Sequence, residues 1–305
     1  MKNLLALLAL ATASAACQPQ TTTTTAPSAP VVTEHPSNPA KKQSPLPVLF
    51  GPADTLSAAM RSLLQKHDLS ALWSGTDKQR RITPVLEGFF GPDHYRFMMV
   101  ITAARRDAQN PAVYQVQGKC HYRKNIRPFF GTLTVRQVVD SEKYYSPQDA
   151  SFHPVSSDSM SGEAWSAAYE QAVGQAAYYS LKAQLQLQEA AAANSGIFEG
   201  EAVLNFFVAP GQRVGYAGAP AITEGEPARG SRILLRGTRL NRTTQQVKQF
   251  VVADDVFAAA PDVYKDFGVG ERGGEINPKY AHLGWNEYWE NDEWWAESPK
   301  PKLSL

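Results

Sequence analysis

Aromatic and acidic side chains alternate near the C-terminus, and their types come closest to known site chemistry. The segment spans 285–295, and its aromatic and acidic residues are Trp285, Glu287, Tyr288, Trp289, Glu290, Asp292, Glu293, Trp294 and Trp295. Sugar-handling sites combine aromatic rings, on which a sugar stacks, with paired carboxylates, which transfer protons in glycoside hydrolysis. A ligand or glycan platform at Trp285 and Trp289 is therefore one interpretation. The i, i+3, i+4 spacing of Trp285, Tyr288 and Trp289 also predicts the buried face of a short docked helix. We prefer the docked helix.

The segment Gly268–Gly273 matches the Gly-x-Gly-x-x-Gly dinucleotide fingerprint letter for letter. That fingerprint functions where a buried strand precedes it and a helix follows it, so that the helix N-terminus can hold the pyrophosphate. Here the polar run 264–266 precedes it, and Asn277-Pro278 follows. The context predicts a glycine loop, and we therefore expect no cofactor.

Other catalytic and metal-binding patterns are missing from the sequence. It contains no Walker loop, His-Glu-x-x-His, Cys-x-x-Cys or Gly-x-Ser-x-Gly motif, and its six histidines are isolated from one another. Asp93-His94, beside Arg96, is the best acid and base cluster, but Gly91-Pro92 before it marks a hairpin turn. We expect no metal site and no enzymatic activity.

Alternation of apolar and polar residues dominates the central part of the chain and predicts β-strands. The clearest case is 179–188, where the alternation is unbroken. The predicted strands are 82–88, 95–104, 113–123, 129–138, 179–188, 197–208, 232–241 and 246–253. About eight strands with local connections make an antiparallel meander. This fold class is mainly β, and the meander can close into a barrel; a two-sheet sandwich is the alternative.

Glycines inside the strands favour the barrel, because glycine permits a sharp bend or a close approach of backbones. These glycines are Gly118, Gly131, Gly200 and Gly237. One amphipathic helix is predicted over 55–66, capped by Asp54 or Thr55 and able to cover an open end of the barrel. A weaker helix is predicted over 163–172. The barrel domain with its N-terminal helix is expected to span 47–260, and the glycine-rich loop and docked aromatic segment 261–305.

Four aromatic residues on the predicted inward faces are candidates for lining a ligand cavity inside the barrel. They are Tyr114, Tyr122, Phe198 and Phe206. Cys120 shares the inward face of its strand with Tyr122 and is expected to be a small buried residue, whereas His121 faces the other way. A cavity of a few hundred cubic ångströms would favour a ligand carrier. A filled interior would favour a structural role.

The N-terminus has the features of an export signal. Lys2 precedes the short apolar run 4–11, and small residues follow it. Ser14-Ala15-Ala16-Cys17 resembles the lipobox of bacterial lipoproteins, which implies cleavage after residue 16 and a lipid on Cys17. Ser14 stands where that motif usually has Leu. Ordinary signal-peptidase cleavage after 13–15 is the alternative, and it would leave a periplasmic or secreted protein.

Residues 17–46 are rich in Thr, Pro, Ala and Ser, and such composition predicts a disordered tether. In a lipoprotein, Gln18 in place of Asp resembles the sorting signal for the outer membrane. The chain has 30 Lys and Arg, 29 Asp and Glu and a formal net charge of +1, with no basic stripe. This charge distribution argues against nucleic acid as a partner.

A further resemblance rests on 88–96, Asn110-Pro111, Gly118-Lys119 and 128–132. These segments look like parts of uncharacterised bacterial exported lipoproteins, and the architecture is similar to lipocalin-like barrels. The Gly-x-Trp signature of lipocalins is missing from the first strand. The resemblance implies a fold and no functional residues.

We therefore expect an envelope lipoprotein, anchored to the membrane through a lipid on Cys17, that binds a small apolar or glycan ligand without catalysis. A structural or protein-interaction module with a filled barrel is the alternative. A carbohydrate-active enzyme is the weaker one. The sequence does not identify a protein partner.

Overall fold

The computed structural model describes residues 56–75, 85–141, 167, 175–217, 227–255, 266–269, 275–288 and 293–296. By its internal contacts the chain divides into Met1–Lys41 and Lys42–Leu305, and all described residues belong to the second unit. The predicted signal peptide at 1–16 and tether at 17–46 lie outside the described residues. So do Trp289 and all of the predicted second helix except Ala167. Among the described residues, no helix is long and apolar enough to cross a bilayer.

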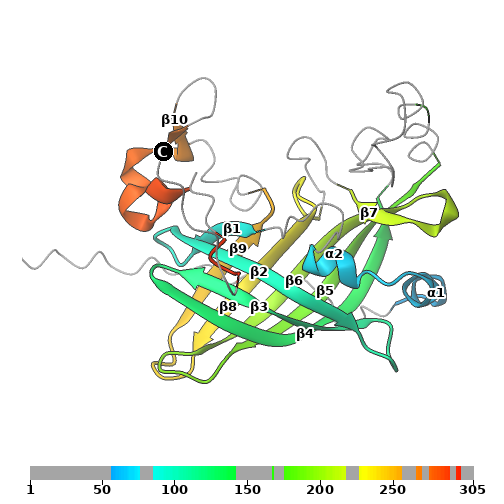
Figure 1. Cartoon of the computed structure of the whole chain (residues 1–305), viewed down its shortest axis with the longest axis horizontal. Helices are drawn as coiled ribbons and strands as arrows, with labels where there is room; N and C mark the ends of the chain where they lie inside the picture. Colours follow the sequence, from blue (N-terminus) through cyan, green and yellow to red (C-terminus); the bar gives the residue numbers. More distant parts are fainter. Residues whose placement is uncertain are drawn as a thin grey trace, which may run out of the picture. The chain divides into compact units, whose positions relative to one another are not determined.

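One antiparallel sheet of nine strands forms the core of the protein (Figure 1). The strands are β1 (Leu86–Phe90), β2 (Tyr95–Arg106), β3 (Val113–Tyr122), β4 (Asn125–Asp140), β5 (Ala177–Glu189), β6 (Gly196–Val208), β7 (Val214–Tyr216), β8 (Ile233–Asn241) and β9 (Val247–Ala253). Their order is β5-β4-β3-β2-β1-β9-β8-β6-β7, and β5 also pairs with β6. The pairing of eight strands therefore closes into a ring, with β7 as an extra partner of β6.

Each of the eight predicted strands corresponds to one of the eight that form the ring. The first is displaced: it was predicted over 82–88 and is observed at Leu86–Phe90, while 82–84 lie outside the described residues. Along β5, the inward residues Leu181, Ala183, Leu185 and Leu187 are buried, while Gln186 is exposed. β4 is longer than predicted. Tyr122 pairs with Asn125 across the two-residue turn Arg123-Lys124, and the pairing of β3 with β4 continues through Pro128. The prediction had started this strand only at residue 129.

Close backbone approach explains the glycines inside the strands. Gly200 on β6 lies opposite Gly237 on β8 in the strand register. A Cβ on Gly200 would overlap the backbone oxygen of Arg236, and a Cβ on Gly237 would overlap that of Glu199. The neighbouring strands can approach this closely only because no side chain stands between them.

We expect Gly200→Ala to lower the free energy of unfolding by about 2 kcal/mol, because a strand backbone must move to admit the methyl group. Chemical denaturation monitored by circular dichroism measures the effect. Gln186→Ala, at an exposed position of the adjacent strand, is the control and should change stability by less than about 0.5 kcal/mol. An equally small change for Gly200→Ala would contradict the close-approach explanation.

Two helices cover one end of the ring, α1 (Ala58–Lys66) and α2 (Ser70–Ser74). The predicted helix is confirmed, but its N-cap is Ser57, whose hydroxyl accepts a hydrogen bond from the Met60 amide at 3.2 Å. The predicted caps, Asp54 and Thr55, lie outside the described residues. Trp73 of α2 packs against the inward side chain of Tyr114, with ring centroids 6.3 Å apart. We call this the helix-covered end.

The C-terminal segment packs against the outer face of the ring. It contains a two-stranded hairpin, β10 (Gly268–Val269) with β11 (Glu275–Ile276), and the 3-10 helices η4 (Pro278–Leu283) and η5 (Trp285–Glu287). Trp285 is buried between Phe89 of β1 and Phe267, with centroids 5.1 and 4.5 Å from its own. The indole Nε1 donates to the carbonyl oxygen of His94 at 2.8 Å. The aromatic segment is thus docked, although through 3-10 turns and not the α-helix that the spacing predicted.

Candidate functional site

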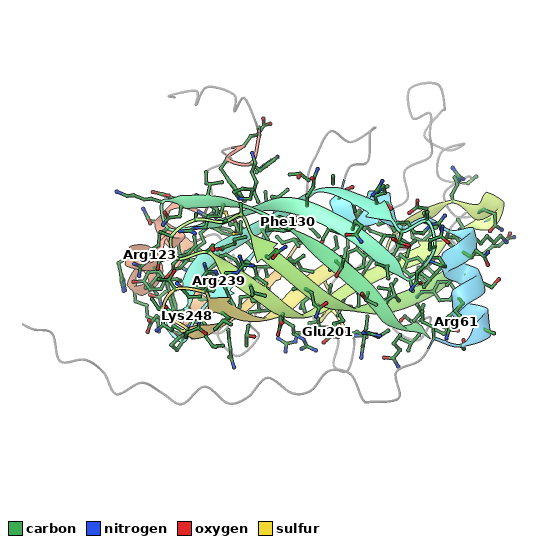
Figure 2. The ribbon with its side chains drawn as sticks, turned by 90° about the horizontal axis from the view of Figure 1, so that it is seen from below. Arg61, Arg123, Phe130, Glu201, Arg239 and Lys248 are labelled. Atoms are coloured by element: carbon green, nitrogen blue, oxygen red, sulfur yellow. The ribbon has the colours of Figure 1, made fainter. Side chains whose placement is uncertain are left out.

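The open end of the ring, opposite the helix-covered end, carries the candidate site. It is bounded by the β1–β2, β3–β4, β5–β6 and β8–β9 turns, and we call it the mouth. Arg123, Arg239 and Lys248 lie at this end, whereas Arg61 of α1 lies at the other (Figure 2). Basic side chains are therefore a prominent feature of the mouth.

Three charged side chains and one thiol form a layer inside the ring just below the mouth. Each stands two residues from a residue deeper in the ring on the same strand face: Cys120 from Gly118, Arg127 from Phe129, Glu189 from Leu187 and Arg239 from Gly237. Side chains two apart on a strand share a face. The alternation that points the core residues inward therefore also points these polar groups inward.

Glu189 is the acceptor at the centre of this layer. Arg239 donates to it with both arms of its guanidinium, Nε to Oε1 at 3.1 Å and Nη2 to Oε2 at 2.7 Å. Arg127 Nη1 lies 3.7 Å from Oε2, and the amide of Gly196 donates to Oε2 at 2.6 Å. Only 3% of the Glu189 side chain is exposed. Two guanidinium groups and a backbone donor thus hold one buried carboxylate.

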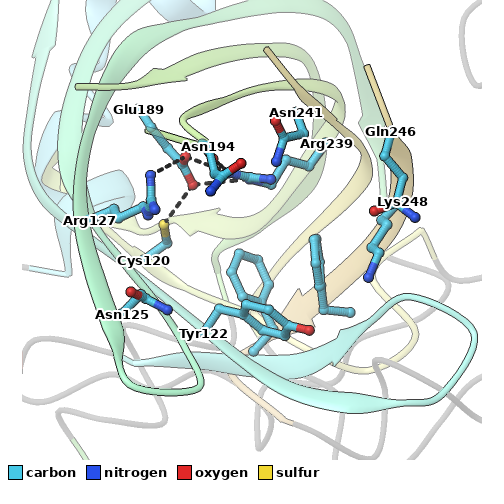
Figure 3. Close-up of a pocket in the computed structure, with 12 residues that line it drawn as sticks. Cys120, Tyr122, Asn125, Arg127, Glu189, Asn194, Arg239, Asn241, Gln246 and Lys248 are labelled. Carbon is cyan, nitrogen blue, oxygen red and sulfur yellow. Dashed lines mark hydrogen bonds and ion pairs between the residues drawn. The ribbon is translucent and has the colours of Figure 1, made fainter. Parts of the chain in front are cut away.

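A cavity of about 270 Å³ opens above this layer (Figure 3). Its lining residues are Phe90, Phe97, Cys120, Tyr122, Asn125, Arg127, Glu189, Asn194, Arg239, Asn241, Gln246 and Lys248. The volume is just below the range of about 300 to 1,000 Å³ that is usual for small-molecule sites. The cavity therefore suits a compact ligand.

The charges of the cavity do not cancel. Arg127, Arg239 and Lys248 contribute three positive charges, and Glu189 contributes the only negative charge among the lining residues. Arg127 donates through Nη2 to the carbonyl oxygen of Ala193 at 3.0 Å, but its buried Nη1 has no hydrogen-bond partner. The cavity thus combines an excess of positive charge with a buried guanidinium nitrogen that makes no hydrogen bond.

Aromatic rings form one side of the cavity. Phe90 lies 5.2 Å from Phe97 and 4.7 Å from Tyr122, measured between ring centroids. The ammonium of Lys248 lies 5.7 Å from the centre of the Phe90 ring. The Tyr122 hydroxyl is protonated at neutral pH, as an ordinary tyrosine hydroxyl is, and can donate a hydrogen bond. Burial raises its pKa further.

Of the site residues predicted from the sequence, only some lie at the cavity. Tyr122 lines the cavity, as proposed for a ligand site. Tyr114, Phe198 and Phe206 are fully buried in the packed core and do not line the mouth cavity. Trp285 is 1% exposed and therefore offers no open face for stacking a ligand. Trp289 lies outside the described residues.

Sequence reasoning missed the four charged side chains of the cavity, Arg127, Glu189, Arg239 and Lys248. A signal for one of them was present. Glu189 stands two residues after Leu187, and so continues the inward apolar series of its strand with a charge. A charged residue in phase with the core of a strand indicates either a strand end or a buried ion pair.

His94, His121 and Asp93 were the other chemical candidates. His94 packs edge-on against Phe89, whereas His121 contacts Trp294. His94 has a positive φ of 59° in the turn between β1 and β2, which fits its prediction as a turn residue. None of the three lines the cavity. In the part of the chain that the structure describes, no group of three or more His, Cys, Asp or Glu could hold a metal ion.

Cys120 is 2% exposed, and its thiol lies 3.5 Å from Oε1 of Glu189. Burial raises the pKa of this thiol, and the adjacent carboxylate raises it further. Because the thiolate is the reactive form, we expect iodoacetamide to leave Cys120 unmodified from pH 7 to pH 9 in the native Cys17→Ser protein. Mass spectrometry should find full modification in denaturant. A Gln186→Cys variant supplies an exposed thiol as positive control, and rapid native alkylation of Cys120 would contradict the prediction.

Comparisons with protein-family models, with curated proteins and with solved structures found no match to this chain. The functional argument therefore rests on the geometry of the mouth.

Proposed function

We propose that this chain is a non-enzymatic binding protein of the cell envelope that holds a small ligand in the mouth of its ring. One observation carries the proposal: a cavity of about 270 Å³ with a polar lining lies above a packed aromatic interior. Ligand sites combine apolar walls with a few converging polar groups. Phe90, Phe97 and Tyr122 supply the apolar wall, and the charged and amide side chains of the lining supply the polar groups.

The architecture that we propose is a lipocalin-like barrel. Eight antiparallel strands, paired mostly with their neighbours in sequence, form the ring. An eight-stranded barrel is just wide enough to be filled by side chains or to hold one small ligand. In this ring the end under the helices is filled by side chains, and the mouth leaves room for a ligand.

The location that we propose is the outer membrane, with a lipid on Cys17 as the anchor and residues 17–46 as the tether. The lipobox-like sequence before Cys17 supports the anchor, and Gln18 supports the sorting. Mass spectrometry of the mature N-terminus tests the anchor. We expect an acylated Cys17, and an unmodified N-terminus further upstream would support a periplasmic or secreted protein instead.

Native mass spectrometry of the protein purified from its own envelope tests the binding function. We expect a mass increment from a small molecule that disappears on denaturation. Variants with a filled mouth, such as Asn241→Trp, should lose the increment, whereas Gln186→Trp on the outer face should keep it. A protein of bare mass, purified without any ligand-exchanging detergent, would contradict the proposal.

A second candidate is a structural or protein-interaction module, and the packing of the lower ring favours it. Tyr114, Phe198 and Phe206 each have 0% exposure in the core. In that case the native mass spectrum would contain a co-purified protein and no small molecule. The mouth variant would not affect this association.

A further inference from the structure

The chemical class of the ligand can be inferred from the mouth, and this inference rests on the proposed binding function. The side chains that line the cavity carry a net positive charge: Glu189 neutralises one of the two guanidinium groups that contact it, and Lys248 adds a third cation. Partly buried charges attract a counter-charge more strongly than exposed ones, because water screens them less. An anionic group on the ligand would restore the balance.

Unused donors indicate where such an anion would bind. Nη1 of Arg127 makes no hydrogen bond, although it is ion-paired with Glu189 at 3.7 Å. Lys248 makes no ion pair among the described residues, and its recorded contact is with the Phe90 ring. Both side chains line the cavity. Figure 3 shows the two on opposite sides of the cavity, so one carboxylate can meet only one of them. Lys248, which makes no ion pair in the described part of the chain, is the donor that suits a carboxylate, because a hydrogen bond between an ammonium and a carboxylate is charge-assisted.

The remaining polar lining consists of carboxamides, from Asn125, Asn194, Asn241 and Gln246. Oδ1 of Asn241 accepts hydrogen bonds from the amides of Thr243 and Thr244, so the Asn241 oxygen is already engaged. Carboxamides both donate and accept hydrogen bonds. Hydroxyl groups also do both, and carboxamides distributed around the cavity (Figure 3) therefore suit a ligand with several hydroxyls.

One part of the cavity wall is apolar and aromatic, formed by Phe90, Phe97 and Tyr122. A ligand that satisfies all three features has a carboxylate, several hydroxyls and one apolar face, within a volume of about 270 Å³. We propose that the mouth binds an acidic monosaccharide of the uronic acid class, with its carboxylate held by Lys248 and its apolar face against the aromatic wall.

Titration calorimetry with four probes tests this proposal: D-glucuronate, D-glucose, benzoate and inorganic phosphate. Glucuronate and glucose differ only at C6, so their ratio isolates the carboxylate. We expect glucuronate to bind at least about tenfold more tightly than glucose, which corresponds to about 1.4 kcal/mol. Benzoate lacks the hydroxyls and phosphate lacks the apolar face, and both should bind more weakly than glucuronate.

Variants locate the effect at the mouth. Lys248→Gln should reduce glucuronate affinity about tenfold and leave glucose affinity unchanged, whereas Lys248→Arg should retain most of the glucuronate affinity. Lys66→Gln, in the last turn of α1 at the helix-covered end, removes the same charge and should change neither. Thermal melts of all three variants confirm that each is folded.

Each other outcome overturns the inference. Equal affinity for glucose and glucuronate would exclude the acid, equal affinity for benzoate would exclude the sugar, and equal affinity for phosphate would indicate a general anion site. Binding of no probe would also overturn it. The proposed function has its own test in the native mass spectrum, where a bound neutral molecule would preserve the function while refuting the acidic sugar.

Discussion

Glu189→Gln is expected to lower the free energy of unfolding by about 3 kcal/mol, the largest effect of any single substitution in the mouth. The substitution keeps the shape of the side chain and removes its charge. It leaves Arg239 and Arg127, whose side chains are 13% and 24% exposed, without their shared carboxylate. Removing one partner of a buried ion pair costs about 3–5 kcal/mol, and partial solvation of the two arginines places the expected loss at the lower end.

Chemical denaturation measures this loss, and Glu199→Gln is the matched control. Glu199 lies on β6 and is exposed, so the same change of charge there should alter stability by less than about 0.5 kcal/mol. The double variant Glu189→Gln with Arg239→Gln should recover part of the stability, because it removes one of the uncompensated cations. If Glu189→Gln and Glu199→Gln have equal effects, the buried carboxylate does not organise the mouth.

Trp285→Ala is expected to cost about 3–5 kcal/mol, the range for truncating a buried large aromatic residue. Trp285 is 1% exposed, packs on Phe89 and Phe267, and donates through Nε1 to the His94 carbonyl. The loss should be accompanied by faster proteolysis of the C-terminal segment, since this side chain packs directly on Phe89 of β1.

The control for Trp285 is Trp295→Ala. Trp295 is half-buried and contacts Trp294 edge-on at 5.7 Å, so its truncation should cost clearly less than that of Trp285. Limited proteolysis and denaturation are measured on both variants. Equal resistance to protease in Trp285→Ala and the unmodified protein would show that the segment is held by other contacts.

The two ends of the ring have different physical roles. At the helix-covered end, Leu64, Leu69 and Trp73 enter the core and exclude water from the interior. Arg106 ties α1 to β2 through a hydrogen bond from Nη1 to the Leu64 carbonyl at 2.7 Å. At the mouth, charged and amide side chains replace apolar ones. Ligand access is therefore proposed at the end where polar groups need not be desolvated fully.

Strand positions and facing were predictable because they depend on local periodicity. The unbroken alternation at 179–188 predicted β5, and inward glycines such as Gly200 predicted the close approach of neighbouring strands. The presence of the amphipathic helix α1 was also predictable from its apolar spacing. Its exact start was not, since several residues near position 55 can cap a helix and only the packing selects Ser57.

The amino-acid sequence by itself thus determined the strands, their inward faces and the prediction of a signal with Cys17. Only the tertiary structure decided that the cavity lies at the mouth and that Arg127, Glu189 and Arg239 meet there. Glu189 and Arg239 are on strands that do not pair with each other, and Arg239 reaches the carboxylate by passing Gly196, where a Cβ would collide with its guanidinium. Ring closure sets this meeting point. It depends on pairing between distant strands, which no local pattern specifies.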